Sequence, residues 1–100
     1  MRQFVSGTFV GTGALVNVPI GWQPDAVEIV NITDGTSVEK WFTGMAAGTS
    51  VKISGGTVAP VTANAISLLA GDTNTTKGFS VGTASNVLGK TYAYTALRGA

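Results

Sequence analysis

The segment that most resembles a chemical motif lies near the end of the chain, where Gly82 precedes Gly89-Lys90-Thr91. A phosphate-binding loop has the pattern G-x-x-x-x-G-K-[ST], in which four residues separate the glycines so that backbone N–H groups converge on the phosphates. Here six residues separate them, and the required glycine position holds Ala84. The loop must also lead into a helix, whereas the residues that follow, TYAYTALR, alternate as a strand does. We therefore predict no nucleotide site.

Acid–base and metal chemistry have few candidate residues. Histidine and cysteine are absent, which removes the commonest general base and the thiolate and imidazole metal ligands. A glycosidase needs two carboxylates that flank a cleft. Glu28 and Glu39 fall on facing strands, where we expect them to be solvated or paired with Lys40 or Lys52, and the other acids fall in turns or loops. The five acids are Asp25, Glu28, Asp34, Glu39 and Asp72. The sequence predicts no catalytic residue, no cofactor and no enzyme.

The polar segment 71–78, GDTNTTKG, offers oxygen ligands of the kind that Ca²⁺ prefers. Asp72, Asn74 and Thr76 alternate along it, but a single carboxylate supplies too little charge for a firm site. We expect a flexible loop, and whether segment 71–78 binds an ion stays open at this point.

The charge distribution favours neither nucleic acid nor a membrane. The formal net charge is +1, and the six basic residues are dispersed along the chain. No segment approaches the ~18 consecutive apolar residues that a membrane helix needs. The start, MRQFVSGTF, has no apolar region that would make it a secretory signal. We expect synthesis in the cytoplasm and partners that are proteins.

The elements that position these residues are predicted to be short strands. Fourteen glycines punctuate the chain at short intervals, and between them lie runs of Val, Ile, Thr, Phe and Tyr. Such spacing is typical of an all-β sandwich or barrel. We predict a single domain over residues 1–100, an antiparallel, jelly-roll-like β-sandwich of about eight strands with little or no helix.

The expected strands follow the apolar runs. The third is expected to be central in the sheet, and Pro19 should lie at a strand end or on an edge because it cannot donate a ladder hydrogen bond. The run ANAISLLAG is the best candidate for a helical turn, since Ala and Leu favour helix. The strands cover residues 2–10, 14–20, 26–33, 37–42, 50–54, 65–70, 79–81 and 91–98.

Exposed aromatic residues are the candidates for protein contacts. Trp41 and Phe42 are adjacent on one predicted strand, so they point to opposite faces. Either one of them is exposed and anchors an interface together with Met45, or both faces are covered and both residues are core. Trp22 is expected to cap one end of the sandwich. The candidate interface residues are Arg2, Phe4, Trp41, Phe42, Met45 and Arg98.

The low charge content indicates a subunit of an assembly. Charged residues make up 11% of the chain, against about 25% in typical soluble domains. Thr, Ser, Asn and Gly must therefore cover much of the surface, which suits a protein that neighbours partly cover. We expect residues 1–3 to form a short N-terminal arm and residues 98–100 a C-terminal tail.

Three segments in order resemble small structural proteins of tailed bacteriophages. These segments are GTGALVNVPIGWQPDAVEIVNITDG, KWFTGMAAG and GFSVGTASNVLGKTYAYTALR, and together they extend from Gly11 to Arg98. The shared features are a G-x-G turn, a G-[FW]-x-P-D turn, a W-[FY]-x-G-M segment and a closing G-K-T-Y-x-Y-x-A-x-R strand. Each motif is short, and the resemblance rests on their order and spacing.

The resemblance implies a virion component of the capsid decoration, or cement, type. Such a protein binds the outer surface of the major capsid protein shell as an oligomer, with a homotrimer favoured, and stabilises the capsid. It is made in the cytoplasm of the host bacterium and ends on the capsid surface. The alternative is a tail fibre, spike or baseplate component that binds a host receptor or glycan, with Trp22, Trp41 or the tyrosine pair as stacking platforms.

Overall fold

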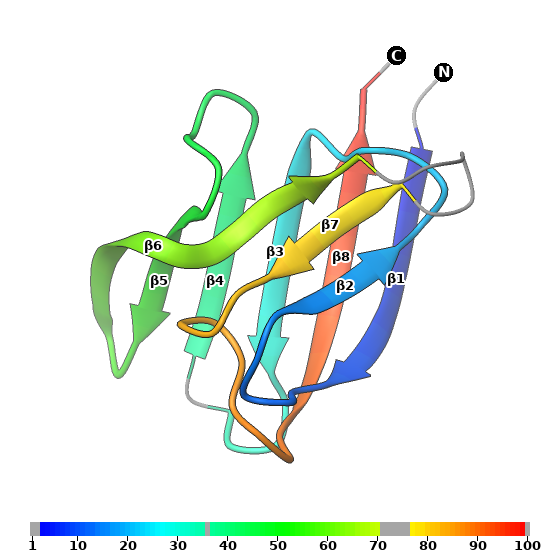
Figure 1. Cartoon of the computed structure of the whole chain (residues 1–100). Coiled ribbons are helices and arrows are strands. Elements are labelled where there is room, and N and C mark those ends of the chain that lie inside the picture. Colours follow the sequence, from blue (N-terminus) through cyan, green and yellow to red (C-terminus); the bar gives the residue numbers. More distant parts are fainter. Residues whose placement is uncertain (1–2, 36, 71–76, 100) are drawn as a thin grey trace.

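The computed structural model describes residues 3–35, 37–70 and 77–99, and this part of the chain is all-β (Figure 1). Eight antiparallel strands are present and no helix occurs among these residues, as the sequence predicts. The strands are β1 (Gln3–Val10), β2 (Val16–Pro19), β3 (Ala26–Asn31), β4 (Ser37–Phe42), β5 (Thr49–Ser54), β6 (Thr57–Leu69), β7 (Gly78–Val81) and β8 (Thr91–Arg98).

All eight strands belong to one sheet in the order β1-β8-β3-β4-β5-β6-β7-β2. The sheet curls so that β2, β7 and the end of β6 lie over β1, β8 and β3 (Figure 1). The result is a nearly closed, barrel-like sheet rather than a sandwich of two separate sheets. The third strand is central, between β8 and β4, and Pro19 ends the edge strand β2, as predicted.

Strand β6 is much longer than the predicted run 65–70. It begins at Thr57 and pairs first with β5 and then with β7. The register of the β5–β6 pairing shifts between Thr49 and Ser50, opposite residues 61–66 of β6. Within that stretch Asn64 has a φ of 58°, the left-handed region that Asn tolerates better than most residues. The helical alternative for ANAISLLAG is wrong, because residues 63–69 are strand. This bend carries β6 from one layer to the other.

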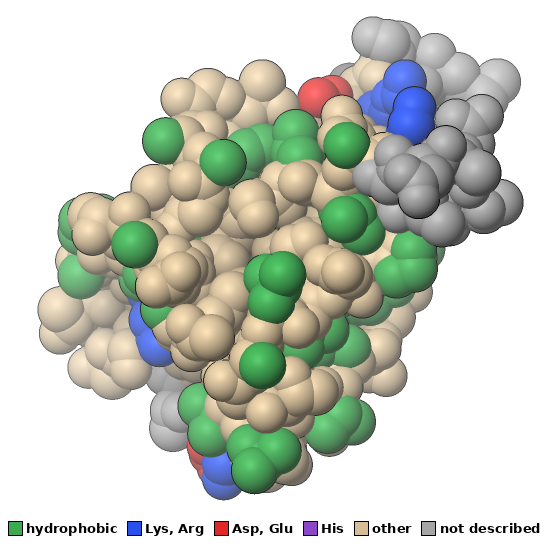
Figure 2. Space-filling view, in the orientation of Figure 1, with side chains coloured by type: hydrophobic (Ala, Val, Ile, Leu, Met, Phe, Trp, Pro, Cys, Tyr) green, Lys and Arg blue, Asp and Glu red, His purple; other side chains and the backbone are tan. Residues whose placement is uncertain are grey.

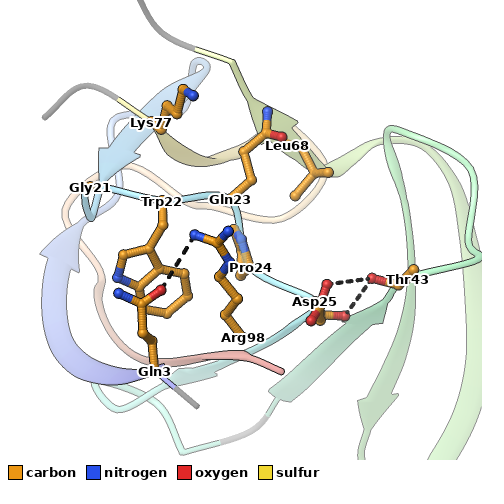
Figure 3. A pocket seen from close by; sticks show the side chains of 10 residues that line it. All are labelled: Gln3, Gly21, Trp22, Gln23, Pro24, Asp25, Thr43, Leu68, Lys77 and Arg98. Carbon is orange, nitrogen blue, oxygen red and sulfur yellow. Dashed lines mark hydrogen bonds between the residues drawn. The ribbon is translucent and has the colours of Figure 1, made fainter. Parts of the chain in front are cut away.

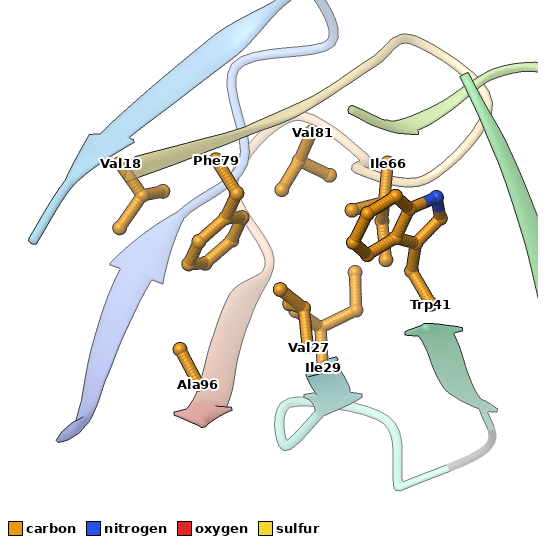
Figure 4. Packing of buried hydrophobic residues seen from close by; sticks show 8 residues of the cluster. All are labelled: Val18, Val27, Ile29, Trp41, Ile66, Phe79, Val81 and Ala96. Carbon is orange, nitrogen blue, oxygen red and sulfur yellow. The ribbon is translucent and has the colours of Figure 1, made fainter. Parts of the chain in front are cut away.

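The core lies between the two layers (Figure 4). Alternate residues of each strand point inward, so side chains of β2, β6 and β7 meet those of β3, β4 and β8. Burying each large apolar side chain completely contributes about 1.5–3 kcal/mol. The buried cluster comprises Val18, Val27, Ile29, Trp41, Ile66, Phe79, Val81 and Ala96.

Glu39 also points into the barrel, so of the two alternatives predicted for it solvation is wrong and pairing with a lysine holds. It lies on the same face of β4 as Trp41 and is 3% exposed. Its Oε2 accepts hydrogen bonds from Ser50 Oγ at 3.0 Å and Ser85 Oγ at 2.5 Å, and Lys52 Nζ lies 3.6 Å from Oε1. The predicted pairing with Lys52 is thus present, but two buried hydroxyls complete the shell around the carboxylate.

We predict that Glu39→Ala lowers the free energy of unfolding by about 2–4 kcal/mol, because it leaves two buried hydroxyls without their acceptor. Glu28→Ala is the matched control. Glu28 forms an exposed pair with Lys40 at 3.4 Å, and such pairs contribute about 0–1 kcal/mol. Urea unfolding followed by tryptophan fluorescence measures both variants, and equal losses would contradict the structural role of the buried carboxylate.

Candidate functional site

The structure describes five of the six predicted interface residues and gives them different surroundings. Phe4 and Phe42 are exposed, by 65% and 49%. Trp41 is 4% exposed, so its prediction as an interface anchor was wrong and it belongs to the core. Met45 is partly buried against that core, and its Sδ accepts a hydrogen bond from the backbone N–H of Phe42 at 3.3 Å. Of the two alternatives for Trp41 and Phe42, the one with a single exposed residue holds.

Of the other two predicted residues, the structure describes one. Arg2 lies outside the described residues. Arg98 is exposed, but it is adjacent to Leu97 on β8 and so points to the opposite face of the sheet. Its guanidinium borders a hollow at one end of the barrel. Arg98 therefore does not belong to a common surface with the two phenylalanines.

Phe4 and Phe42 lie in one row across the outside of the barrel. Phe4 on β1 is paired with Leu97 on β8, Leu97 with Ala26 on β3, and Ala26 with Phe42 on β4. Directly opposed residues on one face lie ~5 Å apart between Cβ atoms, so the four side chains form a continuous strip. A shallow depression of 120 Å³ lies over Ala26, between Phe42 and Leu97. Leu97 is 45% exposed.

A second apolar row runs parallel to the first, four residues further along the strands. It joins Ala93, Val30, Val38, Ile53 and Val58 by direct cross-strand pairing. Most of these side chains are partly buried, whereas Val58 is exposed. These two rows, together with the row of Glu28 and Lys40 between them, form the surface that we call the outer face.

The row between them carries the charges of this surface. Glu28 and Lys40 are paired across β3 and β4, with Nζ 3.4 Å from Oε2. They are the charged side chains among the outward positions of β1, β8, β3 and β4. The outer face is thus electrically neutral and largely apolar, which is typical of the centre of a protein interface.

The sequence contains no local signal for the first row. The alternation within TYAYTALR places Leu97 on one face of its strand, and Ala26 begins another run. Their contact depends on the pairing of β3 with β8, which joins residues far apart in the chain. Leu97 and Ala26 were therefore missed as interface residues, although Phe4 and Phe42 were found.

A hollow of 720 Å³ opens at the end of the barrel where β1 begins and β8 ends (Figure 3). Its wall includes the Trp22 indole, the amides of Gln3 and Gln23, and the cations of Arg98 and Lys77. Arg98 Nη1 donates a hydrogen bond to Gln3 Oε1 at 3.4 Å. The prediction that Trp22 lies at one end of the fold is confirmed by this position.

The remaining acids hold loops and strands in place. Asp25 accepts hydrogen bonds from Thr43 Oγ1 at 3.3 Å and from the Gly99 N–H at 2.8 Å. Asp34 Oδ1 lies 3.1 Å from Lys90 Nζ. The possible ion ligands of segment 71–78 lie at 72–76, outside the described residues. Elsewhere in the described chain, no three acids gather into a metal-binding group.

The front of the molecule carries little charge (Figure 2). On this face, which β2 and β7 form, apolar side chains are separated by polar surface, and the basic and acidic groups lie toward the margins. The described part of the chain contains no helix long and apolar enough to cross a membrane. No family model, no curated protein and no solved structure matches this chain.

Proposed function

We propose that this protein is a structural subunit that binds other protein subunits through its outer face, and that its partner is the major capsid protein of a phage shell. The observation that carries the proposal is the exposed row of Phe4, Leu97, Ala26 and Phe42. Single exposed apolar residues are common on protein surfaces, whereas contiguous apolar patches mark sites of association.

The physical character of the surface supports this proposal. Only 11% of the residues are charged, and the single ion pair of the outer face leaves it neutral. The sheet behind the row consists of four paired strands, so the anchors stand on a rigid support and lose little entropy on binding. The resemblance of the sequence to phage decoration proteins supplies the identity of the partner, and it also favours a trimer at the junctions between capsomers.

A binding assay with purified expanded shells tests the proposal. Saturable, stoichiometric binding is expected, and Phe42→Lys should weaken it by about 30-fold or more, since buried aromatic anchors contribute ~2 kcal/mol or more to binding. Leu88→Lys is the matched control, because Leu88 is 73% exposed but lies in the loop between β7 and β8. Undiminished binding of the Phe42→Lys protein would contradict the proposed contact surface.

The copy number in a purified virion separates this function from its alternative. Hundreds of copies on the head support a decoration protein. A few copies at the tail would instead support the fibre, spike or baseplate alternative and overturn the assignment to the shell. Sedimentation of the isolated protein tests the oligomeric state, for which a trimer is expected.

A further inference from the structure

The hollow at the end of the barrel has the size and composition of a small-ligand site. Its volume of 720 Å³ falls within the range of about 300–1,000 Å³ that such sites occupy. The wall combines one large aromatic ring with side chains that can donate several hydrogen bonds. This hollow lies beside the outer face but is not part of it, so it has no role in the function proposed above.

Trp22 is the aromatic residue that can serve as a platform in this hollow. Trp41 and Tyr92 are each 4% exposed and belong to the interior. Tyr94 packs edge-on against Phe79, with ring centroids 5.4 Å apart. The indole of Trp22 is only partly buried and borders the open space (Figure 3). Flat apolar rings of this kind bind the C–H face of a sugar, while neighbouring polar groups bind its hydroxyls.

The polar groups around Trp22 favour a negatively charged ligand. Gln3 and Arg98 lie on the same side of the hollow as the indole, whereas Asp25 and Thr43 lie on the other side (Figure 3). Both carboxylate oxygens of Asp25 already accept hydrogen bonds. Arg98 donates to the neutral amide of Gln3 and forms no ion pair within the described chain.

We propose that this hollow binds an acidic saccharide, a sugar ring that carries a carboxylate. The ring lies on Trp22, the carboxylate binds the Arg98 guanidinium in the two-pronged geometry that arginine offers to carboxylates, and the amides of Gln3 and Gln23 bind hydroxyls. Lys77 adds a second positive charge to the wall. The ligand's carboxylate would replace the weak 3.4 Å contact between Arg98 and Gln3.

The site stays accessible when the outer face is covered. Gln3 and Arg98 precede and follow Phe4 and Leu97 along their strands, and neighbouring residues of a strand point to opposite faces. A subunit that docks through Phe4 and Leu97 would therefore present the hollow at the rim of the contact. A shell covered with such subunits would display many copies of a weak saccharide site, which multiplies its avidity.

Calorimetric titration of the full-length protein with trigalacturonate tests this proposal, with the fully methyl-esterified trisaccharide as the uncharged probe. Saturable binding of the acid is expected, at least tenfold tighter than binding of the ester, and weaker at high salt. Arg98→Gln should reduce the affinity for the acid at least tenfold and abolish the difference between the two probes. Lys90→Gln, which removes a cation outside this hollow, is the matched control and should change neither affinity.

Two further variants distinguish a loss of binding from a loss of folding. Trp22 packs against the core as well, so Trp22→Phe, which keeps a ring, is preferable to alanine and should weaken both probes. Gln3→Ala, at the exposed start of β1, should weaken both severalfold without a change in thermal midpoint. Absence of saturable binding, equal affinity for acid and ester, or an unaffected Arg98→Gln protein would each overturn the proposal. None of these outcomes changes the expected shell binding, which Phe42→Lys tests separately.

Discussion

Replacing Asn86 with alanine should lower the free energy of unfolding by about 3 kcal/mol or more, because five backbone groups, two of them buried carbonyls, lose this partner at once. Asn86 is 3% exposed. Its Oδ1 accepts hydrogen bonds from two backbone N–H groups at 3.0 Å, and its Nδ2 lies within 3.2 Å of three carbonyl oxygens. The donors belong to Thr12 and Gly13, and the acceptors belong to Ala14, Val81 and Gly82.

The large effect follows from what these bonds connect. Residues 12–14 join β1 to β2, the two edge strands of the sheet, and residues 82–90 join β7 to β8. The Asn86 amide therefore fastens two connections at the place where the barrel-like sheet nearly closes. An orphaned buried N–H or C=O costs about 1–3 kcal/mol, and water that enters the gap recovers only part of that.

Urea unfolding followed by tryptophan fluorescence measures the effect, with Asn17→Ala as the matched control. Asn17 is exposed and accepts one hydrogen bond, from the buried Ser80 Oγ, so Asn17→Ala removes the partner of a single group and should lower the free energy of unfolding by only about 1 kcal/mol. Asn86→Asp should be at least as damaging as alanine, because it keeps the shape but removes the donors and places a charge beside three carbonyl oxygens. A loss below 1 kcal/mol for Asn86→Ala would show that the amide does not hold these connections together.

The strands could be predicted because their signals are local. Alternation and β-branched residues mark 37–42 and 91–98, and β4 and β8 have those same bounds. Strand β6 was cut short because Pro60 and the small residues around it lack a strand pattern. These residues form a strand through pairing with β5, a tertiary contact that overrides the weak local propensity.

The candidate interface was predicted only in part for the same reason. Exposure of Phe42 follows from burial of its neighbour Trp41, but alternation alone does not say which of the two is inside. The contact of Phe42 with Ala26 and Leu97 depends on the order of strands in the sheet. The inward position of Glu39 is also a tertiary effect, because Ser85, in the loop before β8, supplies its second hydroxyl.

Gly82→Ala should lower the free energy of unfolding by about 3 kcal/mol, which is at the upper end of the destabilisation that overpacking produces. A Cβ atom at this position would lie 2.3 Å from the carbonyl oxygen of Asn64 and 2.5 Å from its carbonyl carbon. These are backbone atoms, and they cannot rotate away from a new methyl group as the end of a side chain can. They also sit where β6 bends between layers, and the Asn64 oxygen accepts a hydrogen bond from the Ala84 N–H at 2.9 Å. The glycine that suggested a phosphate loop therefore permits a close approach of two backbone segments.

Gly55→Ala is the control that separates close approach from backbone strain. Gly55 has a φ of 58°, and nothing lies within 4 Å of its would-be Cβ, so only the left-handed conformation opposes a side chain there, at about 1–2 kcal/mol. Gly82 has no such positive φ, so the whole loss of stability in Gly82→Ala comes from the contact with Asn64. Thermal unfolding should show a midpoint drop of roughly 15 °C for Gly82→Ala and about one third to two thirds of that drop for Gly55→Ala. Equal drops would mean that β6 can move away from the loop after Val81, and that the bend at Asn64 does not depend on a glycine opposite it.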